Sequence, residues 1–189
     1  MVQRPGAELG GGATKGEQPY KHRWPWIAAA AGVLLAIVLA GKLPMGRTPD
    51  SGELIAQEIL DSHLRSIMPG HLTDIQSSDR NAVKSWFNGK VDVTPPVEDL
   101  AMDGFTLTGG RLDSISGRTV AALVYRRNQH VINVYSWTSA MPLSAAVGST
   151  RDGYHLIHWT QAGSAWWLVS DLEEAELQHF AALLRRSAH

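Results

Sequence analysis

Histidine has the widest chemical scope among the side chains of this sequence, because an imidazole can act as an acid, a base or a metal ligand. The histidines between residue 50 and the C-terminal residue are His63, His71, His130, His155, His158 and His179. His155 and His158 are three apart in an expected strand, so they should point to opposite faces and cannot easily share a metal. We retain His71, His130 and His158 as weak candidates for metal or haem binding, and we favour ordinary hydrogen-bonded histidines.

The sequence carries no familiar catalytic pattern. It has no cysteine, which excludes disulfides, thiolate zinc sites and cysteine nucleophiles. It also has no phosphate-binding loop, no Gly-x-Ser-x-Gly elbow, no His-Glu-x-x-His motif and no dinucleotide fingerprint, and Gly109-Gly110 indicates only a turn. The net charge of −1 gives no electrostatic reason to expect nucleic acid binding. We therefore predict that the protein is not an enzyme, holds no cofactor and binds no nucleic acid.

Three tryptophans in the C-terminal part offer a second kind of site, a surface for a partner protein. They are Trp159, Trp166 and Trp167. Adjacent tryptophans on a strand point to opposite faces, so we expect at least one of Trp166 and Trp167 to lie in the core. The other could anchor a partner, although core packing of both is the favoured interpretation.

An apolar run at residues 24–41 determines where we expect these residues to lie. A helix of this length spans about 27 Å, close to the thickness of the hydrocarbon layer of a membrane. We predict a transmembrane anchor formed by Trp24, Trp26, Leu34, Leu35, Ile37, Val38 and Leu39. The alternative is a signal peptide cleaved after Ala40. Positive charges before the run favour an N-terminus inside the cell, which would place the C-terminal domain in the periplasm, held at the inner membrane.

The remaining sequence divides into a tail, a spacer and one domain. Residues 1–23 are rich in glycine and charge and predict a flexible cytoplasmic tail, and residues 42–50 predict a linker. In residues 51–189, apolar periodicity predicts helices that begin near Ser51, near Asp79 and after Ser170. Alternating patterns predict strands in between, with turns at Ser116-Gly117 and at residues 161–164. Residues 138–153 appear rich in turns. The fold class that we predict is α+β, with one transmembrane helix, about five antiparallel strands and helices packed on one side.

Many short segments in residues 55–180 resemble a known family. They are residues 64–74, 78–79, 83–90, 95–100, 109–113, 120–126, 130–133, 154, 158–159 and 170–172. Together they resemble the extracytoplasmic domain of bacterial transmembrane anti-sigma factors, also described as transmembrane transcriptional regulators. In that family a cytoplasmic domain, often with a His-x-x-x-Cys-x-x-Cys zinc motif, holds the sigma factor. Residues 1–23 contain no such motif.

The resemblance implies a sensor domain that acts by binding. We therefore expect a single-pass, membrane-anchored protein whose outer domain docks on another envelope or membrane protein or complex. One alternative is a true anti-sigma factor that signals across the membrane through a sigma factor. The other is an envelope protein that handles metal or haem.

Overall fold

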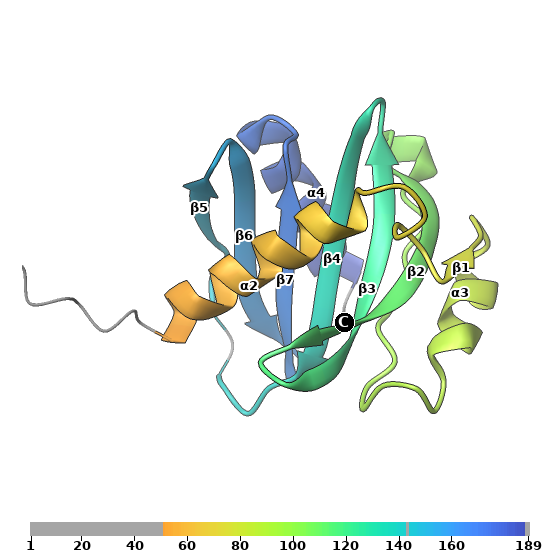
Figure 1. Ribbon diagram of the computed structural model, residues 1–189, viewed down its shortest axis with the longest axis horizontal. Helices are drawn as coiled ribbons and strands as arrows, with labels where there is room; N and C mark the ends of the chain where they lie inside the picture. The colour runs from red at the N-terminus through yellow and green to blue at the C-terminus, as the bar shows by residue number, and fades with distance from the viewer. Residues whose placement is uncertain (1–50, 143, 188–189) are drawn as a thin grey trace, which may run out of the picture. The chain divides into compact units, whose positions relative to one another are not determined.

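Figure 1 shows the computed structural model of the chain, which describes residues 51–142 and 144–187. Within these residues, seven antiparallel strands form one sheet in the order β1-β2-β3-β4-β7-β6-β5. The strands are β1 (Ile75–Gln76), β2 (Thr106–Ile115), β3 (Arg118–Arg127), β4 (His130–Thr138), β5 (Val147–Arg151), β6 (Tyr154–Gln161) and β7 (Ser164–Ser170). The helices are α2 (Ser51–Ser66), α3 (Arg80–Phe87), α4 (Glu174–Ser187) and the short 3-10 helix η1 (Ala101–Asp103).

Tight turns join the long strands. Ser116 and Gly117 both have positive φ angles, 51° and 73°, as a two-residue hairpin turn of type I′ requires. Ala162 and Gly163 make the corresponding turn between β6 and β7. The two hairpins that the sequence predicts are therefore confirmed.

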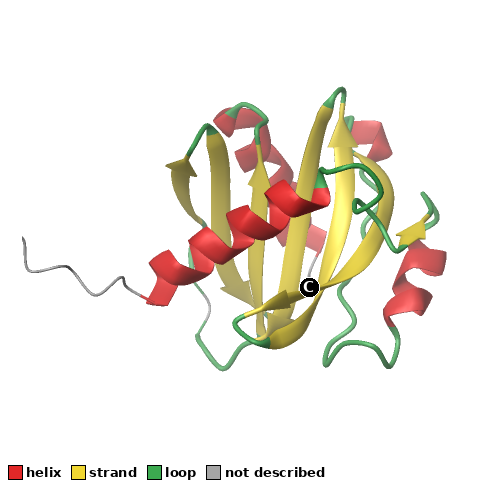
Figure 2. Cartoon of the chain, viewed as in Figure 1, coloured by secondary structure: helices red, strands yellow, loops and turns green. Residues whose placement is uncertain are grey.

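The helices cover both faces of the sheet, as Figure 2 shows, with α2 in front and α4 behind. One apolar cluster lies under α2 and includes Ile59, Leu60 and Trp137. A larger cluster lies under α4 and includes Phe105 and Phe180. The central strands are buried on both faces because each face has its own helix.

Two consecutive glycines allow β1 and α3 to approach β2 closely. Gly109 has a φ of 153°, and a Cβ atom there would overlap the carbonyl oxygen of Ile75. A Cβ on Gly110 would lie 2.7 Å from the Phe87 ring. The expectation that Gly109-Gly110 indicates a turn is wrong, since both residues lie inside β2.

The predicted fold class needs correction in two respects. The sheet has seven strands rather than about five, and the helices lie on two sides rather than one. The prediction missed β1 because it has only two residues, and β5 because it is short, mostly exposed and at the sheet edge, with no alternation of apolar and polar residues. The apolar pattern of residues 120–125 on both faces already indicated that β3 is covered from both sides.

The predictions of a transmembrane helix and of an inner-membrane location are contradicted. A membrane span needs about 20 apolar residues. Among the described helices none is long and apolar enough to cross a membrane: α2 has 16 residues with one apolar face, and α4 has 14 residues with charges at both ends. The segment 24–41, with the predicted anchor residues, lies outside the described residues, as do the predicted tail and linker.

Candidate functional site

A buried arginine lies at the centre of the candidate site. Arg111 is on β2, on the face that α2 covers, and its side chain is only 6% exposed. Its Nε and Nη2 atoms donate to Asp113 Oδ2 at 3.2 and 3.0 Å, and Nη2 also donates to the Tyr135 hydroxyl at 2.8 Å. These partners are needed because a buried charge without them is strongly destabilising.

Groups from α2 and β4 extend this ion pair into a network. Ser62 Oγ donates to Asp113 Oδ2. Since its only hydrogen is used there, the Tyr135 hydroxyl must donate to Ser62 Oγ, which is 2.7 Å away. Asn133 Nδ2 donates to Ser66 Oγ at 2.8 Å. Burial raises the pKa of Tyr135, so this hydroxyl keeps its proton.

Regular spacing brings the members of the network together. Arg111 and Asp113 are two residues apart on β2 and therefore share a face, as do Asn133 and Tyr135 on β4. The two serines of α2 are four residues apart, on one side of the helix.

Two polar contacts fix α2 over this part of the sheet. Glu58 accepts hydrogen bonds from the backbone N–H of Ser116, at 2.8 Å, and from its hydroxyl, at 3.1 Å. Nearer the start of the helix, Arg151 on β5 pairs with Glu53 at 3.5 Å. The helix thus contacts both the β2–β3 turn and the edge strand β5, and its C-terminal end lies next to Arg111.

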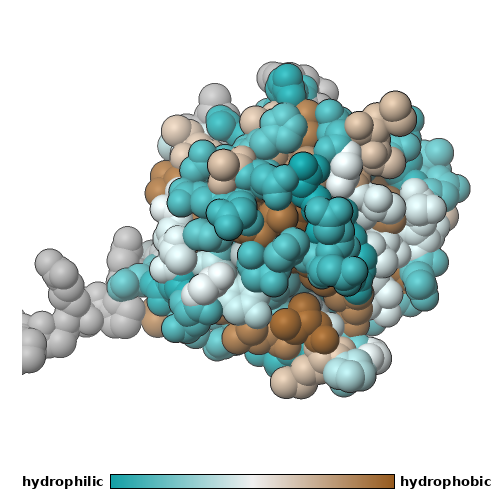
Figure 3. Space-filling view, turned by 90° about the horizontal axis from the view of Figure 1, so that it is seen from above, coloured by the Kyte–Doolittle hydropathy of each residue, from teal (hydrophilic) through white to brown (hydrophobic). Residues whose placement is uncertain are grey.

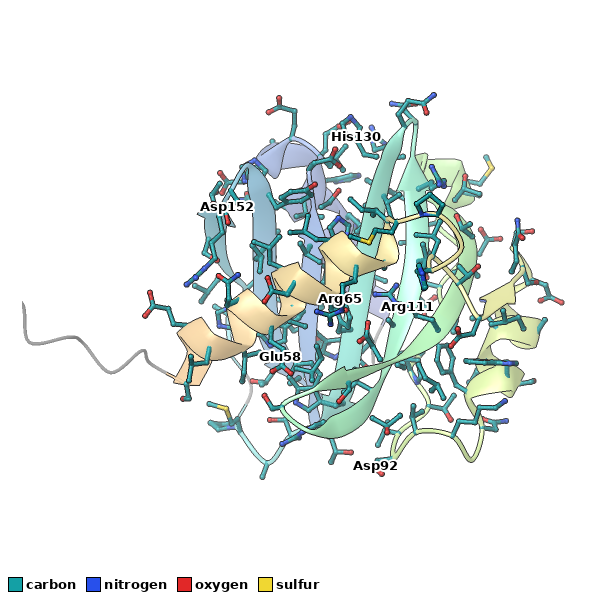
Figure 4. The ribbon with its side chains drawn as sticks, viewed as in Figure 1. Glu58, Arg65, Asp92, Arg111, His130 and Asp152 are labelled. Atoms are coloured by element: carbon teal, nitrogen blue, oxygen red, sulfur yellow. The ribbon has the colours of Figure 1, made fainter. Side chains whose placement is uncertain are left out.

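A pocket of about 350 Å³ opens above the network, between the end of α2, the following loop and β2. It is lined by Ser62, Arg65, Ser66, Met68, Gly70, His71, Asp74, Arg111, Leu112 and Asp113. Figure 4 shows Arg65 on α2 and Arg111 on β2 in this region. Its volume falls within the range of pockets that bind small molecules or single side chains.

The carboxylates of the pocket are already engaged. Asp74 Oδ2 accepts from the backbone N–H of Leu112 at 2.9 Å. Asp113 accepts from the arginine and the serine described above through Oδ2, and from the Ser114 N–H through Oδ1 at 2.9 Å. Asp113 is therefore engaged through both of its oxygens, and Asp74 through Oδ2.

Some of the hydrogen-bond donors that line the pocket have no acceptor among the described residues. Arg111 Nη1 carries two N–H groups, and its one contact among the described residues is a long one, 3.4 Å to the Leu72 carbonyl oxygen. Arg65 and His71 are exposed, and their side chains have no hydrogen-bond or ion-pair partner within residues 51–142 and 144–187.

The exposed apolar Met68 lines the pocket, and the exposed Ile67 precedes it in the chain. Ile67 and Met68 follow the last turn of α2, with 44% and 57% of their surfaces exposed. On the face that Figure 3 draws, hydrophobic surface forms patches among mostly hydrophilic residues. Met68 thus adds exposed apolar surface to a pocket that is otherwise lined mainly by polar residues.

His63 lies behind the network, where burial keeps it neutral. Its ring packs edge-on against Tyr154, with centroids 5.3 Å apart. Burial, and then the positive charge of Arg111, lowers the pKa of His63 to about 4. Its Nδ1 atom has no partner among the described residues.

The candidate histidines are not brought together. His71 lines the pocket, His130 begins β4 and lies 3.0 Å from Asp171, and His158 on β6 stacks on Trp167. Burial lowers the pKa of His158. In the part of the chain that the structure describes, no group of three or more His, Asp or Glu residues could hold a metal ion.

The three tryptophans considered as a possible partner surface are buried, in agreement with the favoured interpretation of core packing. Trp159 and Trp166 stack on each other under α4, with centroids 5.7 Å apart, and Trp167 lies under α2. The expectation that Trp166 and Trp167 point to opposite faces is confirmed. Neither one is exposed at the surface, because β7 lies inside the sheet and both of its faces are covered.

Sequence reasoning missed the arginine and the aspartate of β2. The available signal was a charged pair, Arg111 and Asp113, at alternate positions of a strand whose next inward residue is the apolar Ile115. Comparisons of the chain with protein-family models, with curated proteins and with solved structures found no match. The resemblance to the anti-sigma family therefore stays a prediction from the sequence.

Proposed function

We propose that this chain is a non-catalytic binding domain that recognises a partner protein at the C-terminal end of α2. The observation that carries the proposal is the exposed Met68 in the lining of a pocket that also contains the buried Arg111 and Asp113 of the network. The sequence resemblance to the sensor domain of the anti-sigma family supports a role in binding. The engagement of both pocket carboxylates supports a role other than catalysis.

Site-specific photo-crosslinking tests this proposal. A photoreactive amino acid replaces Met68 in the full-length chain, produced in its native cells, and replaces Met102 as the matched control. Met102 is fully exposed on η1 and does not line the pocket. We expect one protein to be crosslinked at position 68 and not at position 102. Identical products at both positions, or none at position 68, would contradict the proposal.

The crosslinked protein is then purified, and its affinity for the full-length chain is measured. Met68→Glu places a charge in the apolar rim and should weaken binding at least about tenfold, because a desolvated charge opposes docking. Met102→Glu should bind as the unchanged chain does.

A further inference from the structure

We infer that the pocket at the end of α2 binds a carboxylate group. This inference rests on the proposed function, since it names the chemistry that the partner brings to the same site. It comes from the hydrogen bonds around the pocket, where both oxygens of Asp113 are used internally while Arg111 and Arg65 keep unused N–H groups.

First, Arg111 is held in place by hydrogen bonds but keeps one N–H group unused. Its guanidinium is held by Asp113 and Tyr135 through Nε and Nη2, which fixes the plane of the group. Nη1 retains an N–H group with no partner in the described part of the chain, since its contact to Leu72 uses at most one of two hydrogens. A nearly buried donor of this kind favours an anionic acceptor, because charge-assisted hydrogen bonds are the strong ones.

The second step is the outer shell of the pocket. Arg65 and His71 line it from α2 and from the following loop, and both are exposed with side chains free to turn toward a ligand. Asp74 faces the same pocket, but its Oδ2 atom accepts from Leu112, which directs that oxygen toward β2. Arg65 and Arg111 therefore supply the unused cationic donors of the pocket, while Asp74 Oδ1 is a carboxylate oxygen with no partner among the described residues.

The third step is size. About 350 Å³ accommodates an aspartate or glutamate side chain, a chain terminus or a small dicarboxylic acid. The planar guanidinium of Arg65 can match the two oxygens of a carboxylate, and Arg111 can add one N–H from Nη1, which favours this group over a spherical anion.

Titration of the purified full-length chain tests the inference. The probes are succinate, with neutral succinamide as its control, and the blocked tripeptide Ala-Glu-Ala, with Ala-Gln-Ala as its control. The readout is the NMR signals of arginine side-chain N–H groups. We expect at least one carboxylate probe to shift the Arg65 and Arg111 signals saturably, while the neutral probes do not. Succinate alone would indicate a free acid, and binding of the peptide would indicate a carboxylate carried by a protein.

Substitutions of exposed residues give a second readout without threatening the fold. Arg65→Gln and His71→Gln should each weaken carboxylate binding, Arg65→Gln by about tenfold, the loss of one charge-assisted hydrogen bond. Arg80→Gln, on exposed α3 and away from the pocket, should not change it. The inference fails if no carboxylate probe binds, if neutral probes bind equally, or if Arg80→Gln weakens binding as much as Arg65→Gln. Crosslinking at position 68 with no carboxylate binding would overturn this inference and leave the proposed function standing. Carboxylate binding without crosslinking at position 68 would overturn the proposed function and leave this inference standing.

Discussion

α4 and α2 cover opposite faces of the same sheet, and their contacts differ in chemistry. Under α4, Phe180 packs against Phe105 and Tyr125, with ring centroids 4.7 and 5.1 Å away, and the ion pair of Arg127 with Glu176 lies at the partly exposed margin. Under α2, apolar packing at one end gives way to a buried ion pair at the other.

This difference distinguishes contacts that stabilise the fold from contacts that form a binding site. Apolar burial stabilises a domain reliably, whereas a buried ion pair often contributes little net stability compared with apolar residues of the same volume. The α4 face therefore accounts for much of the stability. On the α2 face, Arg111 is better explained by the donor that it presents to the pocket.

The largest effect should come from the α4 face. Phe180→Ala removes a fully buried ring and should lower the free energy of unfolding by about 4 kcal/mol, through lost burial and the cavity left behind. Urea denaturation measures this. A loss below about 1 kcal/mol would show that the α4 face does not dominate stability.

A smaller loss of stability should follow from breaking the ion pair between Arg111 and Asp113. Asp113→Ala leaves the charge of Arg111 buried without its main partner, which should cost about 3 kcal/mol by urea denaturation. The double variant R111M/D113L should recover most of that loss, because it removes both charges. A double variant as unstable as the single one would mean that the network is needed for the fold itself.

The free energy of unfolding should also fall as the pH is lowered, because His63 is buried in its neutral form. Its pKa is about 4 in the folded state and 6.5 ordinarily, so the unfolded chain binds the proton more readily in the interval between. The contribution is complete above about pH 6.5 and should fall by about 2 kcal/mol between pH 7 and pH 5. Denaturation at several pH values checks this. His63→Phe should flatten the dependence in this interval, and an unchanged slope would contradict the burial of a neutral imidazole.

The smallest effect on stability should come from the rim of the pocket. Met68 is 57% exposed, so Met68→Glu should change the free energy of unfolding by less than about 0.5 kcal/mol. The same denaturation measurement tests it, with Met102→Glu as the control. A large loss would assign Met68 to the core.

Local signals in the sequence predicted local structure well. Ser116-Gly117 gave the correct hairpin because a two-residue turn selects its own residues, and alternation along residues 130–137 gave β4. β5 gave no such signal, because Gly148 and its polar neighbours are exposed at an edge.

The site could not be predicted from local sequence signals, because it depends on contacts between segments that are distant in the chain. Ser62 meets Asp113, and Ser66 meets Asn133, only after α2 has packed across β2 and β4. Trp166 and Trp167 are an intermediate case. Their opposite directions were predictable from the strand period, but whether either one was exposed depended on the position of β7 inside the sheet.

The central claim is that the end of α2 binds a partner without serving the fold. The most direct test compares Met68→Glu with Met102→Glu for affinity toward the crosslinked partner and for free energy of unfolding. The account predicts that Met68→Glu weakens binding at least about tenfold at unchanged stability, while Met102→Glu changes neither. Equal affinities of the two variants for that partner would contradict it.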